Sequence, residues 1–248
     1  MHVIFHLLGK PYRAELNNGT DISIPLESGE GKVSAWYVPP ISIEPVKGDG
    51  FVGSVAQGGS VNFRNISFNP HGHGTHTECL GHITETLHSV NQKIKEYHLD
   101  AQLITVHPTK HNDDLVIEAD QIPDGALPSA LILRTSPNTA SKLTQQYSDT
   151  NPPYLSSECA KKIVSAGVRH LLIDLPSVDR EVDGGELRAH HIFWQIGADE
   201  RHDASITEMV YVPDEIRDGY YFMNLQFPPF ENDASPSRPI IYPAVPAS

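Results

Sequence analysis

The stretch Pro70-His71-Gly72-His73-Gly74-Thr75-His76-Thr77-Glu78-Cys79-Leu80-Gly81-His82 determines what this chain folds around. It holds four histidines and one glutamate within thirteen residues, with three glycines between them. Neutral imidazole and carboxylate are ligand types that zinc and manganese ions accept. Glycine lets the backbone bend until ligands that are close in sequence converge on one point. This stretch therefore predicts a metal site.

The glycines favour a loop that leads into a short strand. In extended backbone, side chains two residues apart point the same way, so His76 and Glu78 share a face, and His71 can join them through the glycine-containing turn. Two histidines and a carboxylate are a common ligand set for a catalytic metal with open coordination positions. His82 can reach such a site without being a ligand, and His73 is expected in the loop or behind the ligands. The alternative is a solvated loop that is merely rich in histidine.

A second polar cluster combines 174–179 with Arg188-Ala189-His190-His191. It follows an apolar run at 168–175, and α/β proteins tend to place ligands after the C-terminal ends of strands. Adjacent histidines point in different directions, so we expect only one of this pair to be a ligand. Glu208 begins an otherwise apolar strand, and the sequence by itself favours an exposed position at a sheet edge over an inward one.

Bulk properties narrow the class of protein. The chain has 248 residues and a formal net charge of −13, which disfavours nucleic acid and anionic membranes as partners. No apolar run is long enough to span a bilayer, and the N-terminal residues lack the features of a signal peptide, so we expect a cytoplasmic protein. Cys79 and Cys159 are too few for a disulfide framework, and both are expected to be small buried residues.

Periodicity predicts a mixed α/β domain rich in strands, spanning 1–248 as a single unit. Alternating or continuous apolar runs predict strands at 21–26, 61–68, 101–106, 130–134 and 168–175. Helices are expected at 89–97 and 157–166, and 207–212 with 220–227 reads as a hairpin. The chain has no phosphate-binding glycine loop and no Gly-x-Ser-x-Gly elbow, which disfavours nucleotide use and a serine hydrolase.

The chain resembles the cyclase family of metal-dependent hydrolases, which includes bacterial kynurenine formamidase and isatin hydrolase. The family pattern is His-x-Gly-Thr-His-x-Asp-x-Pro-x-His, and Gly74-Thr75-His76-Thr77-Glu78 and His82 match its core. Matching segments recur over most of the chain, at 21–23, 173–179, 189–191 and 233–236. The resemblance implies the α/β swivelling β/β/α fold, and a homodimer in which strands or loops are shared near the active site.

The resemblance also implies a set of site residues. One or two divalent ions, with zinc expected before manganese, would be bound by His71, His76, Glu78, His190 and Glu208, and His82 would be the acid/base. The implied activity is that of a metal-dependent amidohydrolase of the arylformamidase type, cleaving a small aryl formamide such as N-formylkynurenine with a metal-activated water. Two alternatives remain: a cyclic amide (isatin-type) ring hydrolase, and a non-catalytic metal-binding protein.

Four departures from the family pattern concern the surroundings of the site. His71 stands five residues before His76 instead of four, Glu78 replaces Asp, Leu80 replaces Pro, and 193–204 resembles an insertion. Loop changes beside a site alter substrate fit more readily than chemistry. Trp36 and Phe63 are weak candidates for stacking on an aromatic substrate, since aromatic residues more often belong to the core.

Overall fold

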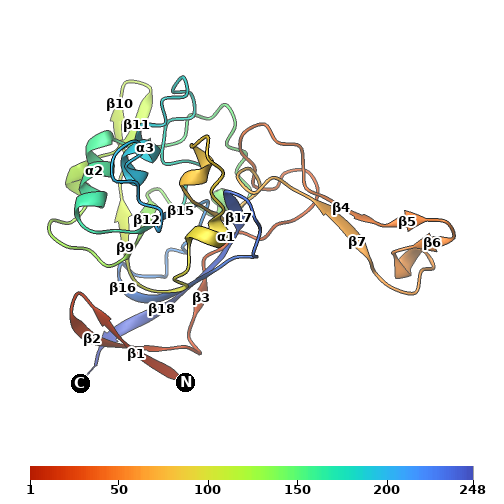
Figure 1. Ribbon diagram of the computed structural model, residues 1–248, viewed down its shortest axis with the longest axis horizontal. Helices are drawn as coiled ribbons and strands as arrows, with labels where there is room; N and C mark the ends of the chain where they lie inside the picture. Colours follow the sequence, from red (N-terminus) through yellow and green to blue (C-terminus); the bar gives the residue numbers. More distant parts are fainter. Residues whose placement is uncertain (248) are drawn as a thin grey trace.

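The computed structural model describes residues 1–247, and its centre is one large β-sheet (Figure 1). Its strands lie in the order β1-β2-β18-β16-β9-β12-β14-β15-β8-β17, and β3 pairs with β18. The bounds of these strands are β1 His2–Leu7, β2 Lys10–Glu15, β3 Thr20–Asp21, β8 His76–Glu78, β9 His98–Val106, β12 Ala130–Thr135, β14 His170–Ile173, β15 Ser205–Glu208, β16 Gly219–Gln226, β17 Ala234–Pro236 and β18 Arg238–Pro246.

The middle of the sheet is parallel and buried on both faces. β9, β12, β14 and β15 run parallel, and the flanking strands pair antiparallel. Along β12, Leu131 and Leu133 face one hydrophobic cluster while Ala130 and Ile132 face another. Strands covered on both faces carry continuous apolar runs, which is why the strands expected at 101–106, 130–134 and 168–175 are confirmed.

Helices cover one face of this sheet, where α2 (Ser157–Ser165) packs against α3 (Arg188–Trp194). The hydroxyl of Ser156 accepts a hydrogen bond from the backbone N–H of Cys159 and caps α2, and Gly167 follows the helix with φ +90°. The predicted helix at 157–166 is therefore confirmed. The predicted helix at 89–97 is shorter, because α1 (Val90–Lys93) ends where the chain becomes extended at Ile94.

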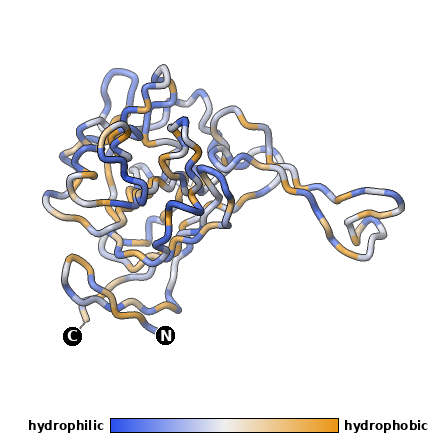
Figure 2. The backbone as a smooth tube through the Cα atoms, in the orientation of Figure 1, coloured by the Kyte–Doolittle hydropathy of each residue, from blue (hydrophilic) through white to orange (hydrophobic). Residues whose placement is uncertain are grey.

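A long two-stranded arm extends away from the sheet (Figures 1 and 2). It comprises β4 Ser42–Pro45, β5 Lys47–Gly48, β6 Phe51–Val52, the 3-10 helix η1 Val55–Gln57 and β7 Arg64–Ser67. The strand expected at 61–68 lies here, with all four residues of β7 exposed. The remaining elements are η2 Leu80–His82, β10 Thr109–His111, β11 Asp114–Ile117, η3 Ala119–Gln121, η4 Ala140–Leu143 and β13 Tyr154–Leu155.

Two predictions about strands are wrong. β15 and β16 form no hairpin, because β15 pairs with β14 and β8 while β16 pairs with β9 and β18. The chain between them crosses the strand ends and is held there by Arg134, which donates to the carbonyls of Pro213 and Ile216. The strand expected at 21–26 extends only to Asp21.

The helices of residues 1–247 include none long and apolar enough to cross a membrane. The cytoplasmic location and the single-domain boundary remain predictions from the sequence.

Candidate metal centre

The predicted site residues meet where four elements come together. β8 lies between β15 and β17, so His76 stands opposite Glu208 in the register. α3 brings His190 to the same place, and η2, directly after β8, brings His82. The loop before β8 brings His71, whose ring centroid lies 5.1 Å from that of His76.

Each ligand candidate directs one atom toward a common centre. His190 Nε2 lies 3.1 Å from Glu78 Oε1, and His71 Nδ1 lies 3.2 Å from Glu78 Oε2. His76 Nε2 lies 3.4 Å from Glu208 Oε2. Candidate ligand atoms of His71, His76 and Glu78 all lie within 4.8 Å of one another, as do those of Glu78, His82 and His190. The sequence-predicted residues are therefore brought together.

The other nitrogen of each ring is held by an oxygen of the protein. His76 Nδ1 lies 2.9 Å from the carbonyl of Gly74, and His190 Nδ1 lies 2.6 Å from Asp179 Oδ2. His71 Nε2 lies 2.8 Å from Asp233 Oδ2. These oxygens are acceptors, so the outward nitrogens donate, and in the neutral rings that a metal ion requires the inward nitrogens carry lone pairs. This arrangement orients metal-binding histidines in proteins.

Two polar atoms inside the cluster support the metal interpretation directly. His76 Nε2 and Glu78 Oε2 are buried, and neither makes a hydrogen bond within residues 1–247. A buried polar atom without a partner is costly, so such atoms call for an explanation such as an ion. Imidazole nitrogens with carboxylate oxygens fit zinc or manganese, and the residues present therefore fit a divalent ion.

The electrostatics of the cluster favour a positive charge among its carboxylates. Burial alone would raise the pKa of Glu78, but His82, His190 and His71 hold it well below its usual range. Burial would lower the pKa values of the two partner histidines, yet Asp233 and Glu78 raise that of His71 to about 10, and Asp179 and Glu78 raise that of His190 to about 10. A metal ion has to displace these protons to bind.

The glycines act as the sequence suggests. Gly74 has φ +144°, and a Cβ there would lie 3.2 Å from the side chain of Leu26. A side chain at Gly81 would meet the backbone of His88. Both positions therefore keep the chain close enough to its neighbours for His71 and His82 to reach the centre.

Three further residues of the motifs lie outside the cluster. His73 is buried, with Nδ1 accepting from the N–H of Asn69 and Nε2 within 2.7 Å of the carbonyl of Pro39. Cys79 is buried, and burial raises the pKa of its thiol to about 11, so it remains a neutral thiol. His191 is exposed on α3 while His190 is buried.

Glu208 corrects the interpretation made from the sequence by itself. Its side chain is buried, and β15 lies inside the sheet between β14 and β8, not at an edge. Glu208 Oε1 accepts from the backbone N–H of Val178 at 3.2 Å. The inward position that the resemblance implied is therefore the observed one.

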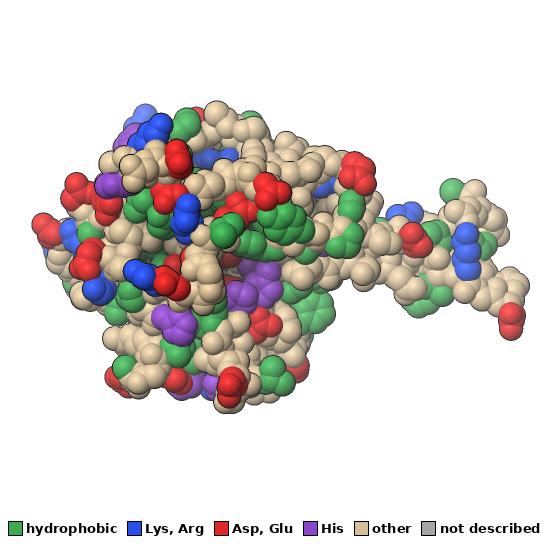
Figure 3. Space-filling view, turned by 90° about the horizontal axis from the view of Figure 1, so that it is seen from above, with side chains coloured by type: hydrophobic (Ala, Val, Ile, Leu, Met, Phe, Trp, Pro, Cys, Tyr) green, Lys and Arg blue, Asp and Glu red, His purple; other side chains and the backbone are tan. Residues whose placement is uncertain are grey.

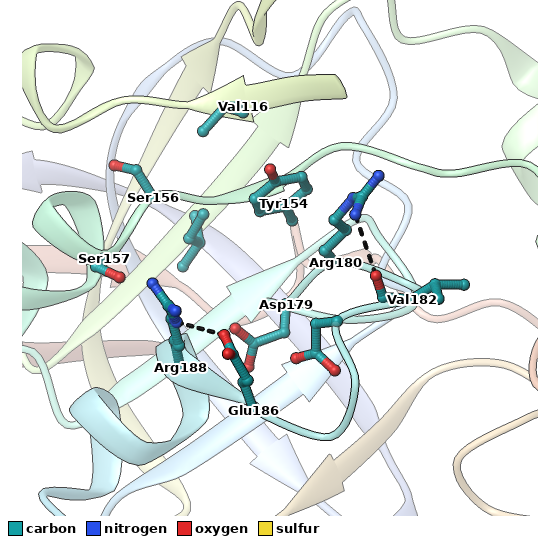
Figure 4. A pocket seen from close by; sticks show the side chains of 11 residues that line it. Val116, Tyr154, Ser156, Ser157, Asp179, Arg180, Val182, Glu186 and Arg188 are labelled. Atoms are coloured by element: carbon teal, nitrogen blue, oxygen red, sulfur yellow. Dashed lines mark hydrogen bonds and ion pairs between the residues drawn. The ribbon is translucent and has the colours of Figure 1, made fainter. Parts of the chain in front are cut away.

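Sequence reasoning assigned no role to Asp179 or Asp233, the two carboxylates that hold His190 and His71. Asp179 also accepts from the backbone N–H groups of Ala189 and His190. It lines a cavity of about 440 Å³ between α2, β13 and the loop before α3 (Figure 4). The arginines of this cavity are engaged, Arg188 with Glu186 and Arg180 with the carbonyl of Val182, and the cavity is a separate space behind Asp179, not the metal cluster.

The cluster opens to solvent on one side. His76, Glu78 and His190 are buried, whereas the side chains of His71, His82 and Asp233 are 18%, 31% and 25% exposed. Figure 3 shows histidine side chains gathered in a hollow of the face seen from above. A small molecule would therefore approach past His82.

The aromatic candidates from the sequence lie elsewhere. Phe63 is exposed on the arm, where its ring contacts that of Phe51. Trp36 packs against a separate hydrophobic cluster that contains Tyr147. Phe68 and Phe230, with ring centroids 6.2 Å apart, each stand three residues before a residue of the cluster, His71 and Asp233 respectively.

Comparisons with known proteins identify the family of this chain. The family model described as "Putative cyclase" matches residues 20–180, more than half of the chain. The chain is 32% identical over 189 residues to the kynurenine formamidase of Bacillus cytotoxicus, covering 75% of this chain and 83% of that protein. It is 31% identical over 196 residues to the kynurenine formamidase of Bacillus anthracis, covering 77% and 84%.

Solved structures show the same fold. A potential metal-dependent hydrolase with cyclase activity superposes with a TM-score of 0.65 at 19% identity, covering 91% of this chain and 98% of that one. Isatin hydrolase A of Labrenzia aggregata gives 0.61 at 16% identity, covering 90% and 93%. The strand-rich α/β fold expected from the resemblance is confirmed, and the chain belongs to the cyclase family.

Proposed function

We propose that this protein is a metal-dependent amide hydrolase that cleaves a small aryl formamide such as N-formylkynurenine. The proposal is supported by relatives named kynurenine formamidase that match about three quarters of the chain. The observation that carries it is the convergence of three oriented imidazoles on two buried carboxylates, with one open side.

The residues that would hold the metal are His71, His76, Glu78, His190 and Glu208. Glu78 directs one oxygen toward His71 and the other toward His190, so both of its oxygens would be available as ligands. Zinc is our first choice and manganese the second, because nitrogen and carboxylate ligands accept both. A bound ion would polarise a substrate carbonyl and lower the pKa of a bound water from about 15.7 to about 7.

His82 is the proposed acid/base. Its Nδ1 lies 3.4 Å from Asp233 Oδ2, while Nε2 lies 3.8 Å from Glu78 Oε2 on the open side of the cluster. Hydrolysis of an amide requires a proton on the departing nitrogen, and His82 can take a proton from the nucleophile and deliver it there. The buried ligands have no comparable access to solvent.

The test combines substrate and metal measurements. We expect metal-loaded protein to hydrolyse N-formylkynurenine, and His82→Ala to lose at least about 100-fold in kcat while it retains its metal. Full activity of His82→Ala would remove His82 from the mechanism. Turnover of isatin but not of the formamide would favour the ring hydrolase. No turnover of either, with only protein ligands on the ion, would favour a metal-binding protein without catalysis.

We further propose that two copies of the chain associate through the arm. Val55, Phe63 and Ile66 expose 55%, 58% and 61% of their surface on a ribbon that has no core of its own. Two-stranded ribbons are marginal when isolated, so a second copy that covers this ribbon would stabilise it. Sedimentation equilibrium should give twice the chain mass, and a monomer at micromolar concentration would contradict the proposal.

A further inference from the structure

Asp233 lies far from the histidine motif in sequence, yet it is fixed beside that motif. It directly precedes β17, in which Ala234 stands opposite Glu78 in the pairing with β8. The backbone N–H of Cys79 donates to the carbonyl of Asp233 at 3.0 Å. The backbone of Asp233 is therefore attached to the same strand that carries two ligand candidates.

One carboxylate oxygen of Asp233 faces two imidazoles. Oδ2 lies 2.8 Å from His71 Nε2 and 3.4 Å from His82 Nδ1. The rings of His71 and His82 are stacked, with centroids 4.2 Å apart and planes inclined by 28°. Asp233 thus lies along one edge of the two stacked rings. Glu78 lies along the opposite edge, 3.2 Å from His71 Nδ1 and 3.8 Å from His82 Nε2.

The chemistry of the groups fixes where the hydrogens lie. An ionised carboxylate only accepts, so each nitrogen that faces Asp233 has to carry a hydrogen. A histidine that binds an ion is neutral, and a neutral imidazole with one N–H presents a lone pair on its remaining nitrogen. These remaining nitrogens, His71 Nδ1 and His82 Nε2, both face Glu78 and the centre.

We propose that Asp233 is a positioning residue that selects both tautomers at once, directing His71 Nδ1 to the metal and His82 Nε2 to the reacting proton. The His71 part depends only on metal binding. The His82 part rests on the proposed function, because it concerns proton transfer during hydrolysis. Carboxylates that orient metal-binding histidines typically contribute about 10–100-fold to metal affinity or activity.

A different role is open to the same side chain. Candidate ligand atoms of His71, His82 and Asp233 lie within 4.8 Å of one another, so the three groups could themselves bind an ion. In that case, removing the carboxylate would remove a ligand and change the metal stoichiometry. A positioning residue leaves the stoichiometry unchanged, so the two roles give different results.

The chain offers a matched control two residues earlier. Glu231 lies in the same segment, but its carboxylate accepts from the side chains of Asn91 and Gln92 instead of from histidines. Asp233→Asn removes the charge and leaves the shape, Asp233→Glu keeps an acceptor, and Glu231→Gln repeats the charge loss away from the rings. All three are compared in full-length, zinc-loaded protein.

Two readouts do not depend on activity. Nitrogen-15 spectra of histidine-labelled protein report the tautomers of His71 and His82, and competition with a chromophoric chelator gives the zinc dissociation constant. In Asp233→Asn we expect unchanged stoichiometry, zinc binding weakened by about 10–100-fold, and a changed His82 tautomer. We also expect kcat to fall on the order of 100-fold with little change in KM. Asp233→Glu should recover the tautomers, and Glu231→Gln should match the parent.

Wild-type tautomers and zinc affinity in Asp233→Asn would overturn the proposal, as would loss of one equivalent of zinc. If Asp233→Asn does not fold, parental tautomers and affinity in a folded Asp233→Ala variant would overturn it. If the parent protein hydrolyses no formamide, the proposed function fails, while the tautomer and zinc measurements still decide the role of Asp233.

Discussion

Buried histidines at the two ends of the parallel strands have different hydrogen-bond partners and opposite pKa shifts. At the C-terminal end of β15, His76 stands opposite Glu208, and His190 lies between Asp179 and Glu78. At the N-terminal end of β14, His170 is equally buried, but its Nδ1 meets only the hydroxyl of Ser205 and its Nε2 makes no hydrogen bond within residues 1–247. Burial lowers the pKa of His170 to about 4, whereas carboxylates raise that of His190 to about 10.

The difference shows that burial by itself does not make a histidine a metal ligand. A buried histidine paired with a hydroxyl is a neutral part of the core. A histidine that is held by one carboxylate and aimed at another belongs to a site that attracts a cation. Both kinds occur on one sheet, and the carboxylates make the distinction.

The largest effect is expected from removing a ligand. His76→Ala leaves the cluster without one of its inward nitrogens, so metal affinity should fall by more than the roughly 100-fold that a supporting residue contributes. His170→Ala should leave metal affinity unchanged, although it lowers stability through lost packing. Chelator competition on the two variants checks both statements. An equal loss of metal affinity in both would contradict the proposed difference between the two ends of the sheet.

Acid stability should depend on His170. Its folded-state pKa of about 4 lies below the ordinary histidine pKa of about 6.5, so the unfolded chain binds the proton first as pH falls below 6.5. The free energy of unfolding should therefore decrease between pH 6.5 and 4, by up to about 3 kcal/mol from this group.

Urea titrations at several pH values measure this contribution. The double variant His170→Phe, Ser205→Ala removes the titrating ring and the hydroxyl that it would leave unpaired. The parent should lose more stability than the variant between pH 6.5 and 4, and parallel pH profiles would contradict the prediction.

A smaller effect is expected from the carboxylate that holds His190. Asp179→Asn keeps the hydrogen-bonding shape but removes the charge at 2.6 Å from His190 Nδ1, so metal affinity should fall about 10–100-fold. Asp183, in the following loop, accepts only from backbone N–H groups, so Asp183→Asn serves as the control. Similar metal affinities for the two variants would show that His190 needs no carboxylate behind it.

The smallest effect on the fold is expected from the arm, which belongs to neither end of the sheet. Because Phe63 and Ile66 are exposed, Phe63→Ser and Ile66→Ser should each change monomer stability by no more than about 0.5 kcal/mol. Both should weaken association of two copies in sedimentation experiments. A large loss of metal binding in either variant would contradict this prediction, because it would show that the arm contributes to the metal site.

The local part of the site could be predicted from the sequence. Strand alternation places His76 and Glu78 on one face, and glycines allow His71 to join them, so short-range rules suffice. The buried strands could also be predicted from short-range information, because their apolar runs are continuous. The position of the His190–His191 pair shortly after a buried strand predicts that one of the two reaches the site, and the family resemblance selects His190.

The rest depends on contacts between distant segments. Glu208 looked like an exposed edge residue, because nothing near it in sequence indicates that β8 pairs alongside β15. Asp233 stands 162 residues from His71, and only the pairing of β17 with β8 brings them together. No hairpin forms between β15 and β16 because each strand pairs with other partners, and Arg134 holds the connecting chain across the strand ends.

The most direct test of the central claim is the metal content of three purified proteins: the parent, His76→Ala and His73→Ala. His73 lies in the same loop and is also buried, but it binds Asn69 and Pro39 instead of facing the centre. After zinc loading and removal of free ions, we predict one or two equivalents of zinc in the parent and in His73→Ala, and a clear loss in His76→Ala. Zinc retained in full by His76→Ala, or absent from the parent, would contradict the account.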